Sequence, residues 1–158
     1  MRRKLSSMII VALLVLGGLA MIPAKTVRAA EEMEVIAGSV LLEGVDESVG
    51  EMVQQTKGEF LQSGSSRIVR NGIGKITVGG TTIAQKQVSK VQVSVIVERL
   101  VKGSWLRYTS WSVSKTNAYS VATSKTLTVP RGYYYRVRSI HNANSDIGNS
   151  NTSGIYVE

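Results

Sequence analysis

The amino-acid sequence predicts an all-β protein, an antiparallel β-sandwich of roughly seven to nine short strands. The strongest observation is a run of four valines, at positions 91, 93, 95 and 97, that alternate with other residues. Side chains two positions apart lie on one face of a strand, so this spacing is typical of a strand with one buried face. Short β-branched segments separated by Gly, Asn and Ser continue along the chain, and no stretch after Ala30 shows a helical period.

Residues 88–101 predict a long central strand, because Ile96 and Leu100 add apolar groups to its second face. Asn71-Gly72 predicts a hairpin before it, since both residues tolerate positive φ, and the turn after it is predicted at residues 102–104. Gly79-Gly80 is interpreted as a break between strands, and residues 142–153 as a loop. The other predicted strands are 40–42, 66–70, 74–78, 81–84, 105–113, 119–124, 126–129, 133–140 and 154–157.

The turn at Pro130 is similar to the entry to the penultimate strand of immunoglobulin- or fibronectin-like sandwiches. In those folds a tyrosine near the start of the strand bonds back to the loop, and alternate residues pack inside. We therefore predict that one set of side chains faces inward, namely Tyr133, Tyr135 and Val137. The other set would form a basic, aromatic-tipped stripe on the surface, namely Tyr134, Arg136 and Arg138.

Residues 1–29 predict a cleavable secretory signal peptide. Arg2, Arg3 and Lys4 precede an apolar run over 8–22 that is short for a membrane span, and Val27-Arg28-Ala29 fits cleavage after residue 29. We therefore expect a secreted, extracellular protein that is at most loosely associated with the cell wall. The chain has no Cys, which favours a Gram-positive exporter.

The charge of the chain is unevenly distributed. The formal net charge of +8 falls to +3 when the five bases of residues 1–29 are removed. Residues 30–59 hold eight acids and one base, whereas residues 60–158 hold thirteen bases and three acids. We therefore predict an acidic, partly disordered arm over 30–58 and a β-sandwich domain over 59–158. Either the arm folds back on the domain, or the domain meets an anionic surface.

No pattern of residues predicts catalysis, so we expect a non-enzymatic protein with no catalytic residue, cofactor or metal. His141 is the only histidine, and we interpret it as a loop residue because no partner constellation surrounds it. With Asp146 it would supply only two ligands, which do not make a zinc or calcium site. Glu98 is interpreted as exposed on the face opposite the valines, so a carboxylate pair for glycoside hydrolysis is lacking.

Two interpretations of the tryptophans stay open. Trp105 and Trp111 share strand parity with Arg107 between them, while Tyr108 faces the other way. They would form either a flat platform that stacks sugar rings or, as we favour, part of the core. The predicted binding residues are Tyr134, Arg136, Arg138, Arg107 and Trp111.

Several stretches resemble a known family: Leu42-Glu43-Gly44, Gly79-Gly80-Thr81-Thr82, Gly132-Tyr133-Tyr134-Tyr135, His141-Asn142-Ala143-Asn144 and the ending from Thr152 to Glu158. The family consists of small secreted proteins from Gram-positive, clostridia-type bacteria and is a domain of unknown function. The resemblance covers nearly all of the chain after residue 29. It implies a secreted, single-domain, β-rich protein and brings no activity, cofactor or catalytic residue with it.

The leading hypothesis is a secreted, non-enzymatic β-sandwich module that binds an anionic cell-wall polymer or glycan. Nucleic acid is disfavoured as a partner by secretion and by the small net charge that remains after cleavage. The alternative is a bacteriocin-like or antagonistic effector whose acidic arm shields a basic, membrane-active face. A hydrolase that depends on His141 is the weakest hypothesis. Otherwise, membrane contact is expected only through the signal peptide before cleavage.

Overall fold

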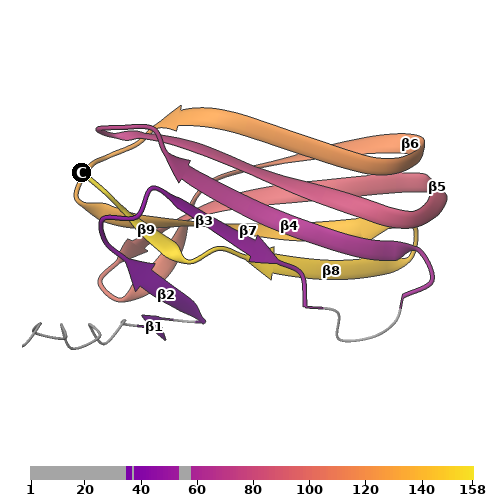
Figure 1. Cartoon of the computed structure of the whole chain (residues 1–158), viewed down its shortest axis with the longest axis horizontal. Helices are drawn as coiled ribbons and strands as arrows, with labels where there is room; N and C mark the ends of the chain where they lie inside the picture. The colour runs from indigo at the N-terminus through magenta and orange to yellow at the C-terminus, as the bar shows by residue number, and fades with distance from the viewer. Residues whose placement is uncertain (1–34, 37, 54–57) are drawn as a thin grey trace, which may run out of the picture. The chain divides into compact units, whose positions relative to one another are not determined.

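The computed structural model describes residues 35–36, 38–53 and 58–158, and every regular element in these ranges is a β-strand (Figure 1). The predicted all-β class is therefore confirmed. The predicted signal peptide lies outside the described residues. The strands are β1 (Val35–Ile36), β2 (Ser39–Leu42), β3 (Glu47–Glu51), β4 (Leu61–Arg70), β5 (Lys75–Val101), β6 (Ser104–Thr128), β7 (Tyr133–Ala143), β8 (Asp146–Asn151) and β9 (Gly154–Val157).

Strands β5 and β6 form one long antiparallel hairpin that is bent back on itself. Their pairing runs from Lys75 opposite Thr128 to Val101 opposite Ser104, and it is interrupted only near the middle and at one bulge. The middle break is a bend, at which both ribbons turn back at the end of the sheet opposite the C-terminus (Figure 1). Residues 84–87 of β5 lie there opposite residue 119 alone, because Ile83 pairs with Ser120 and Val88 with Ala118. The strand β5 therefore takes the longer path around the bend.

The bent hairpin gives the sheet two limbs. In the first limb, β5 residues 75–84 lie between β4 and the second half of β6, and β3 pairs with β4. In the second limb, β5 residues 88–101 lie between β7 and the first half of β6. Strands β8 and β9 pair with β7, and β2 pairs with β9 in parallel. The prediction of a central strand at 88–101 is confirmed.

The sheet is a single curled, mixed sheet, closer to a half-barrel than to an immunoglobulin-like sandwich of two separate sheets. The prediction of short strands was wrong for β5 and β6. In β5, the glycines at positions 79 and 80 were interpreted as a break, whereas β6 contains no glycine and was divided after residue 113, although the chain continues as a strand to Thr128. Gly79 and Gly80 remain inside β5, paired with Arg67 and Ser66 on one side and with Ser124 and Thr123 on the other. They permit close approach instead: a Cβ on Gly80 would lie 2.7 Å from Ser139 Oγ of the opposite limb.

The core lies between the two limbs. The four valines that predicted the central strand have no exposed surface, and neither do Tyr135 and Val137. Their predicted inward orientation is confirmed, whereas Tyr133 remains 37% exposed. The Tyr135 hydroxyl donates a hydrogen bond of 2.7 Å to the Pro130 carbonyl, as predicted for a tyrosine that bonds back to the preceding loop.

The turns follow local chemistry. Lys102 and Gly103, with φ of 49° and 77°, form the two-residue turn between β5 and β6, as predicted. The Asn71-Gly72 hairpin is also present, with residues 71–74 in its loop. The predicted loop at 142–153 is wrong in part, because β7 continues to Ala143 and β8 follows. Asn144 adopts a positive φ of 49° there, so the asparagine that suggested a loop closes a tight hairpin.

The predicted acidic arm contributes strands to the sheet. The short strand expected at 40–42 is β2, while β3 was not predicted. Asp46 pairs with Arg70 at 2.8 Å and Glu47 pairs with Arg67 at 2.6 Å. Within the described residues of this segment, acidic side chains therefore pair with arginines of the domain. This is the first of our two alternatives, an arm that folds back on the domain. The sheet begins before residue 59, where we had placed its boundary.

Gly64 offers a test of the packing between the limbs. A Cβ at this position would lie 2.4 Å from ring atoms of His141 on β7. We expect Gly64→Ala to lower the free energy of unfolding by about 1–3 kcal/mol, because the opposite strand has to move. Urea denaturation measures the change. Gly103→Asn is the control, since nothing lies within 4 Å of that position and Asn tolerates its positive φ. Equal stability of the two variants would contradict the described packing.

Candidate functional site

The predicted basic stripe lies on the outer face of the second limb. Glu98 of β5 is directly opposite Arg107 of β6 on one side and Arg136 of β7 on the other. Arg138 lies two residues further along β7, and its Nη2 lies 3.4 Å from Glu98 Oε1. The structure therefore brings three of the predicted arginines to one face, with a carboxylate between them.

Arg136 is not a surface residue, which corrects the prediction. It is 7% exposed, and its Nε donates to Glu98 Oε2 at 2.7 Å. Its Nη1 donates to Ser39 Oγ of β2 at 2.8 Å, and the guanidinium lies 4.5 Å from the centre of the Trp105 ring. The N-terminal strands cover this part of the face, so Arg136 joins them to the sheet. Glu98, predicted to be exposed, is buried in the same pair.

Tyr134 is also engaged by the N-terminal segment. Its hydroxyl donates to Glu43 Oε1 at 2.5 Å, and its ring lies 5.2 Å from the ring of Tyr156. Arg107 is exposed, and Arg138 is partly exposed. The predicted stripe is therefore divided between a covered part and an open part.

A β-bulge separates the two tryptophans. Thr109 pairs with Val97 but Arg107 pairs with Glu98, so Tyr108 is an extra residue in β6. Because of this extra residue, the β6 side chains before Tyr108 lie on the opposite face from the one that strict alternation would give them. Trp105 consequently lies on the outer face, where its Nε1 donates to the Ile36 carbonyl at 3.0 Å.

Trp111 lies on the inner face and packs against the core, as we favoured, so it does not join the arginines. Its Nε1 donates to Thr123 Oγ1 at 3.0 Å, and the Lys125 ammonium lies 4.5 Å from the ring centre. These contacts join the two limbs of β6 across the open side of the curled sheet. The idea of a platform made by both tryptophans was wrong.

His141 is a core residue and not a loop residue. It has no exposed surface, and its Nδ1 and Nε2 lie 2.8 Å from Thr82 Oγ1 and Ser150 Oγ. Burial lowers the pKa of His141 to about 4, so the ring is neutral at neutral pH. A substrate cannot reach the ring in this conformation.

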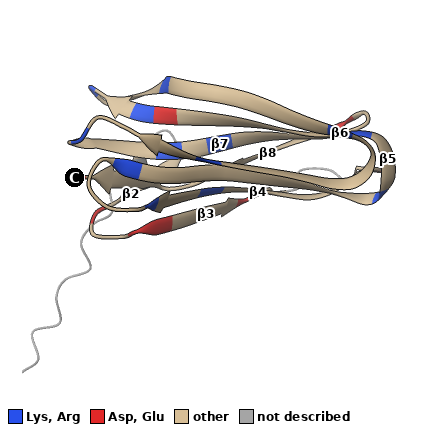
Figure 2. Cartoon of the chain, turned by 90° about the horizontal axis from the view of Figure 1, so that it is seen from above, with Lys and Arg blue, Asp and Glu red and all other residues tan. Residues whose placement is uncertain are grey.

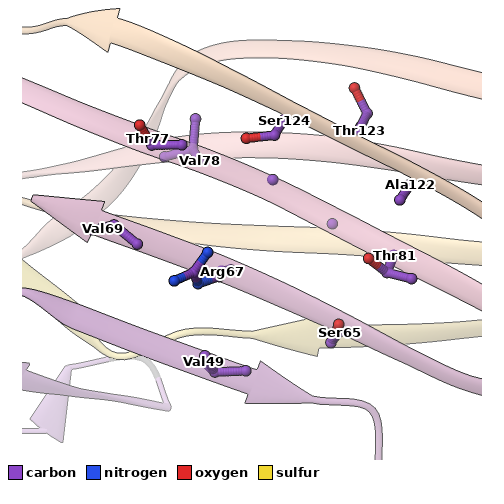
Figure 3. A pocket seen from close by; sticks show the side chains of 12 residues that line it. Val49, Ser65, Arg67, Val69, Thr77, Val78, Thr81, Ala122, Thr123 and Ser124 are labelled. Atoms are coloured by element: carbon purple, nitrogen blue, oxygen red, sulfur yellow. The ribbon is translucent and has the colours of Figure 1, made fainter. Parts of the chain in front are cut away.

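A groove that the sequence did not predict crosses the outer face of the first limb (Figure 3). Its volume is about 430 Å³, within the range of small-ligand sites. Residues of β3, β4, β5 and β6 line it, and Gly79 leaves part of its floor as bare backbone. The lining residues are Val49, Ser65, Arg67, Val69, Thr77, Val78, Gly79, Gly80, Thr81, Ala122, Thr123 and Ser124.

The groove exists because small side chains face outward on three neighbouring strands. One cross-strand row contains Arg67, Gly79 and Ser124, and the next contains Ser65, Thr81 and Ala122. The signal in the sequence was the alternation of small and hydroxyl residues around the double glycine. We missed it because Gly79-Gly80 was interpreted as a turn.

Arg67 is the one charged side chain among the lining residues. Its Nε donates to Glu47 Oε1 at 2.6 Å, and this hydrogen bond lowers the pKa of Glu47. Within the described ranges, the ion pair engages only Nε, so both Nη groups remain available as donors. Both side chains of the pair are about half exposed.

The described part of the chain contains neither a metal-binding cluster nor a membrane-spanning helix. No group of three His, Cys, Asp or Glu residues there is arranged to hold a metal ion. The same residues contain no helix long and apolar enough to cross a bilayer.

The His141 environment predicts a pH-dependent stability. The unfolded chain has a histidine pKa near 6.5 and the folded chain has one of about 4, so only the unfolded state gains a proton between these values. The stabilisation is present above pH 6.5 and is lost as the pH falls towards 4, by about 3 kcal/mol in total. Urea denaturation across this range, with NMR titration of the single histidine, measures it.

His141→Gln is the matched variant, because its amide retains hydrogen-bonding groups but does not titrate. Glu47 and Asp146 also have lowered pKa values, so their contributions are lost only at lower pH, near and below their unfolded values. Between pH 5 and 6.5 the free energy of unfolding of the His141→Gln variant should therefore change little with pH. A folded-state histidine that titrates near its ordinary pKa would overturn the assignment.

Comparison with known proteins places the chain in a family. No curated protein matches it. Among solved structures it is similar to the sporulation control protein Spo0M of Bacillus subtilis, with 12% identity and a TM-score of 0.35. That match covers 72% of this chain and spans half of the length of Spo0M, and it is too weak to support an argument about function. A family model matches residues 27–155, and the chain belongs to this family, the family of unknown function DUF6147.

Proposed function

We propose that this protein is a secreted, non-enzymatic module that binds a cell-wall polymer or glycan along the groove of the first limb. The observation that carries the proposal is the groove itself, an open hollow with a backbone floor and a rim of hydroxyl groups. Secretion rests on the signal-peptide pattern of residues 1–29.

The donors and acceptors of the groove suit a sugar chain. Hydroxyl groups of Ser65, Thr81 and Ser124 face it from three strands (Figure 3). Each hydroxyl both donates and accepts, which is what the hydroxyls of a sugar require. The aliphatic side chains of Val49 and Val69 supply apolar surface at the β3 and β4 side. A polymer would cross the strands and contact these groups in succession.

Arg67 would add a preference for an anionic chain. Its free Nη groups form a planar donor pair that fits a phosphate or carboxylate oxygen. A polyanion contact at an exposed arginine is weakened by salt, so binding to an anionic wall polymer should fall as ionic strength rises. Binding through the hydroxyls alone would change little with salt.

Groove-filling variants test the proposal by sedimentation with isolated Gram-positive cell walls. We expect the exported protein to bind the walls, and we expect Ser124→Trp to bind about tenfold more weakly because the indole fills the groove. Ser120→Trp is the control, since position 120 lies on the same strand and face but outside the groove lining. Equal binding by the two tryptophan variants, or no wall binding by the parent protein, would refute the proposal.

The charge contribution is tested separately with Arg67→Gln. Loss of a charged hydrogen bond should weaken binding about tenfold and flatten its dependence on salt. Walls stripped of their anionic polymers by mild acid should then bind the parent protein and the variant alike. Lys115→Gln, at an exposed lysine beside the bend, controls for a general effect of net charge. If it lowers binding as much as Arg67→Gln, then Arg67 is not a specific contact.

A further inference from the structure

We propose that the end of the sheet formed by three turns docks on an anionic lipid surface. These are the turns at residues 71–74, 102–103 and 129–132. They lie at the end where the chain terminates, opposite the bend of β5 and β6 (Figure 1). We call this end the turn-end surface. It is distinct from the groove, because the two share no residue.

Backbone hydrogen bonds and ring contacts make the turn-end surface continuous. Val129 N donates to the Gly74 carbonyl and Gly132 N donates to the Val157 carbonyl, so the first and third turns meet beside the C-terminal strand. The Arg99 guanidinium lies 4.6 Å from the centre of the Tyr133 ring and 5.8 Å from that of Tyr108. The third turn, at residues 129–132, is therefore joined to β5 and β6, the two strands that the second turn connects.

Apolar and aromatic side chains are exposed on this surface. Ile73 is 69% exposed at the tip of its turn, between two glycines with positive φ. Leu106 is 52% exposed on β6, directly opposite Arg99 of β5. Tyr108 and Tyr133 are each more than a third exposed. Such side chains suit the boundary between headgroups and acyl chains, where apolar tips bury and phenols keep a polar partner.

Cations surround these apolar groups. Lys75, Lys102 and Arg131 are exposed, and Arg99 is partly exposed. None of the four has an ion-pair partner within the described residues. Figure 2 shows lysine and arginine positions gathered towards the end that holds the C-terminus.

The carboxylates at the turn end are already engaged. Asp46 and Glu158 both pair with Arg70, at 2.8 Å and 3.4 Å. Arg70 and the four neighbouring cations outnumber these two carboxylates, so the turn-end surface keeps an excess of positive charge. Each Lys or Arg near an anionic membrane contributes about 1 kcal/mol to binding, so several together give appreciable affinity. Charge and exposed apolar side chains thus favour the same occupant, an anionic bilayer.

Vesicle sedimentation tests the proposal with the exported protein. Its amino terminus must first be established by intact mass, since a retained signal peptide would itself bind lipid. We expect binding to vesicles that contain phosphatidylglycerol and none to vesicles of phosphatidylcholine alone. Lys102→Gln/Arg131→Gln should weaken binding about tenfold or more. Lys90→Gln/Lys115→Gln removes the same charge elsewhere and should have a smaller effect.

The apolar contribution has its own variants. The double variant Ile73→Ser/Leu106→Ser should bind the vesicles more weakly, because its apolar side chains no longer insert. The remaining binding should be more sensitive to salt, because it depends on charge attraction alone. Tyr119→Ser is the control, since Tyr119 is 60% exposed on β6 beside the bend. Thermal unfolding verifies that each variant folds.

Three results would overturn the proposal: no binding to phosphatidylglycerol vesicles, equal losses in the variants and their controls, or binding of a soluble polyphosphate that these vesicles cannot displace. The last result would indicate a soluble polyanion as the partner. Ser124→Trp should bind vesicles like the parent protein, so lipid docking and groove binding can fail independently.

Discussion

The pairing of β5 with β6 on both sides of the bend is the constraint on which the rest of the structure depends. The two strands pair from Lys75 to Ile83 and again from Val88 to Val101, so bending the hairpin produces both limbs of the sheet together. Gln87 supports the bend, because its amide donates to the Asn117 carbonyl at 2.7 Å. Every other described strand is added, directly or through a neighbour, to one of the two limbs. The inner faces then meet across the valines of β5, and the outer face of the first limb carries the groove.

The two outer faces differ because the N-terminal strands cover only part of one. On the second limb, Arg136, Glu98 and Ser39 form a buried polar cluster under β1 and β2. A buried ion pair contributes little net stability, but removing one partner is costly because the other charge remains unpaired. The cluster joins β2 to β5 and β7, and loss of one member of the pair would leave the other charge buried without its partner. Among the described residues, none covers the small side chains of the first limb in this way, and its outer face retains the groove.

Local patterns in the sequence predicted the parts of the fold that depend on local chemistry. The valine alternation predicted the central strand, the Lys102-Gly103 turn was found where expected, and Tyr135 bonds back to Pro130.

Features that depend on a partner strand were not predictable. The bulge at Tyr108 exists only relative to β5, and it moved Trp105 and Trp111 to opposite faces. Burial of Arg136 required residues about 100 positions earlier in the chain. The groove required small residues from several strands, and no single segment carries that pattern.

The arrangement of the two proposed surfaces follows from the same bend. The turns gather at one end because both halves of a hairpin folded at its middle return to the same side (Figure 1). A protein held by that end would present its strands away from the lipid, and the groove crosses those strands on a side face. Lipid contact would then leave the groove open to a polymer in the wall. The fold therefore allows both contacts at once, since no residue is required by both surfaces.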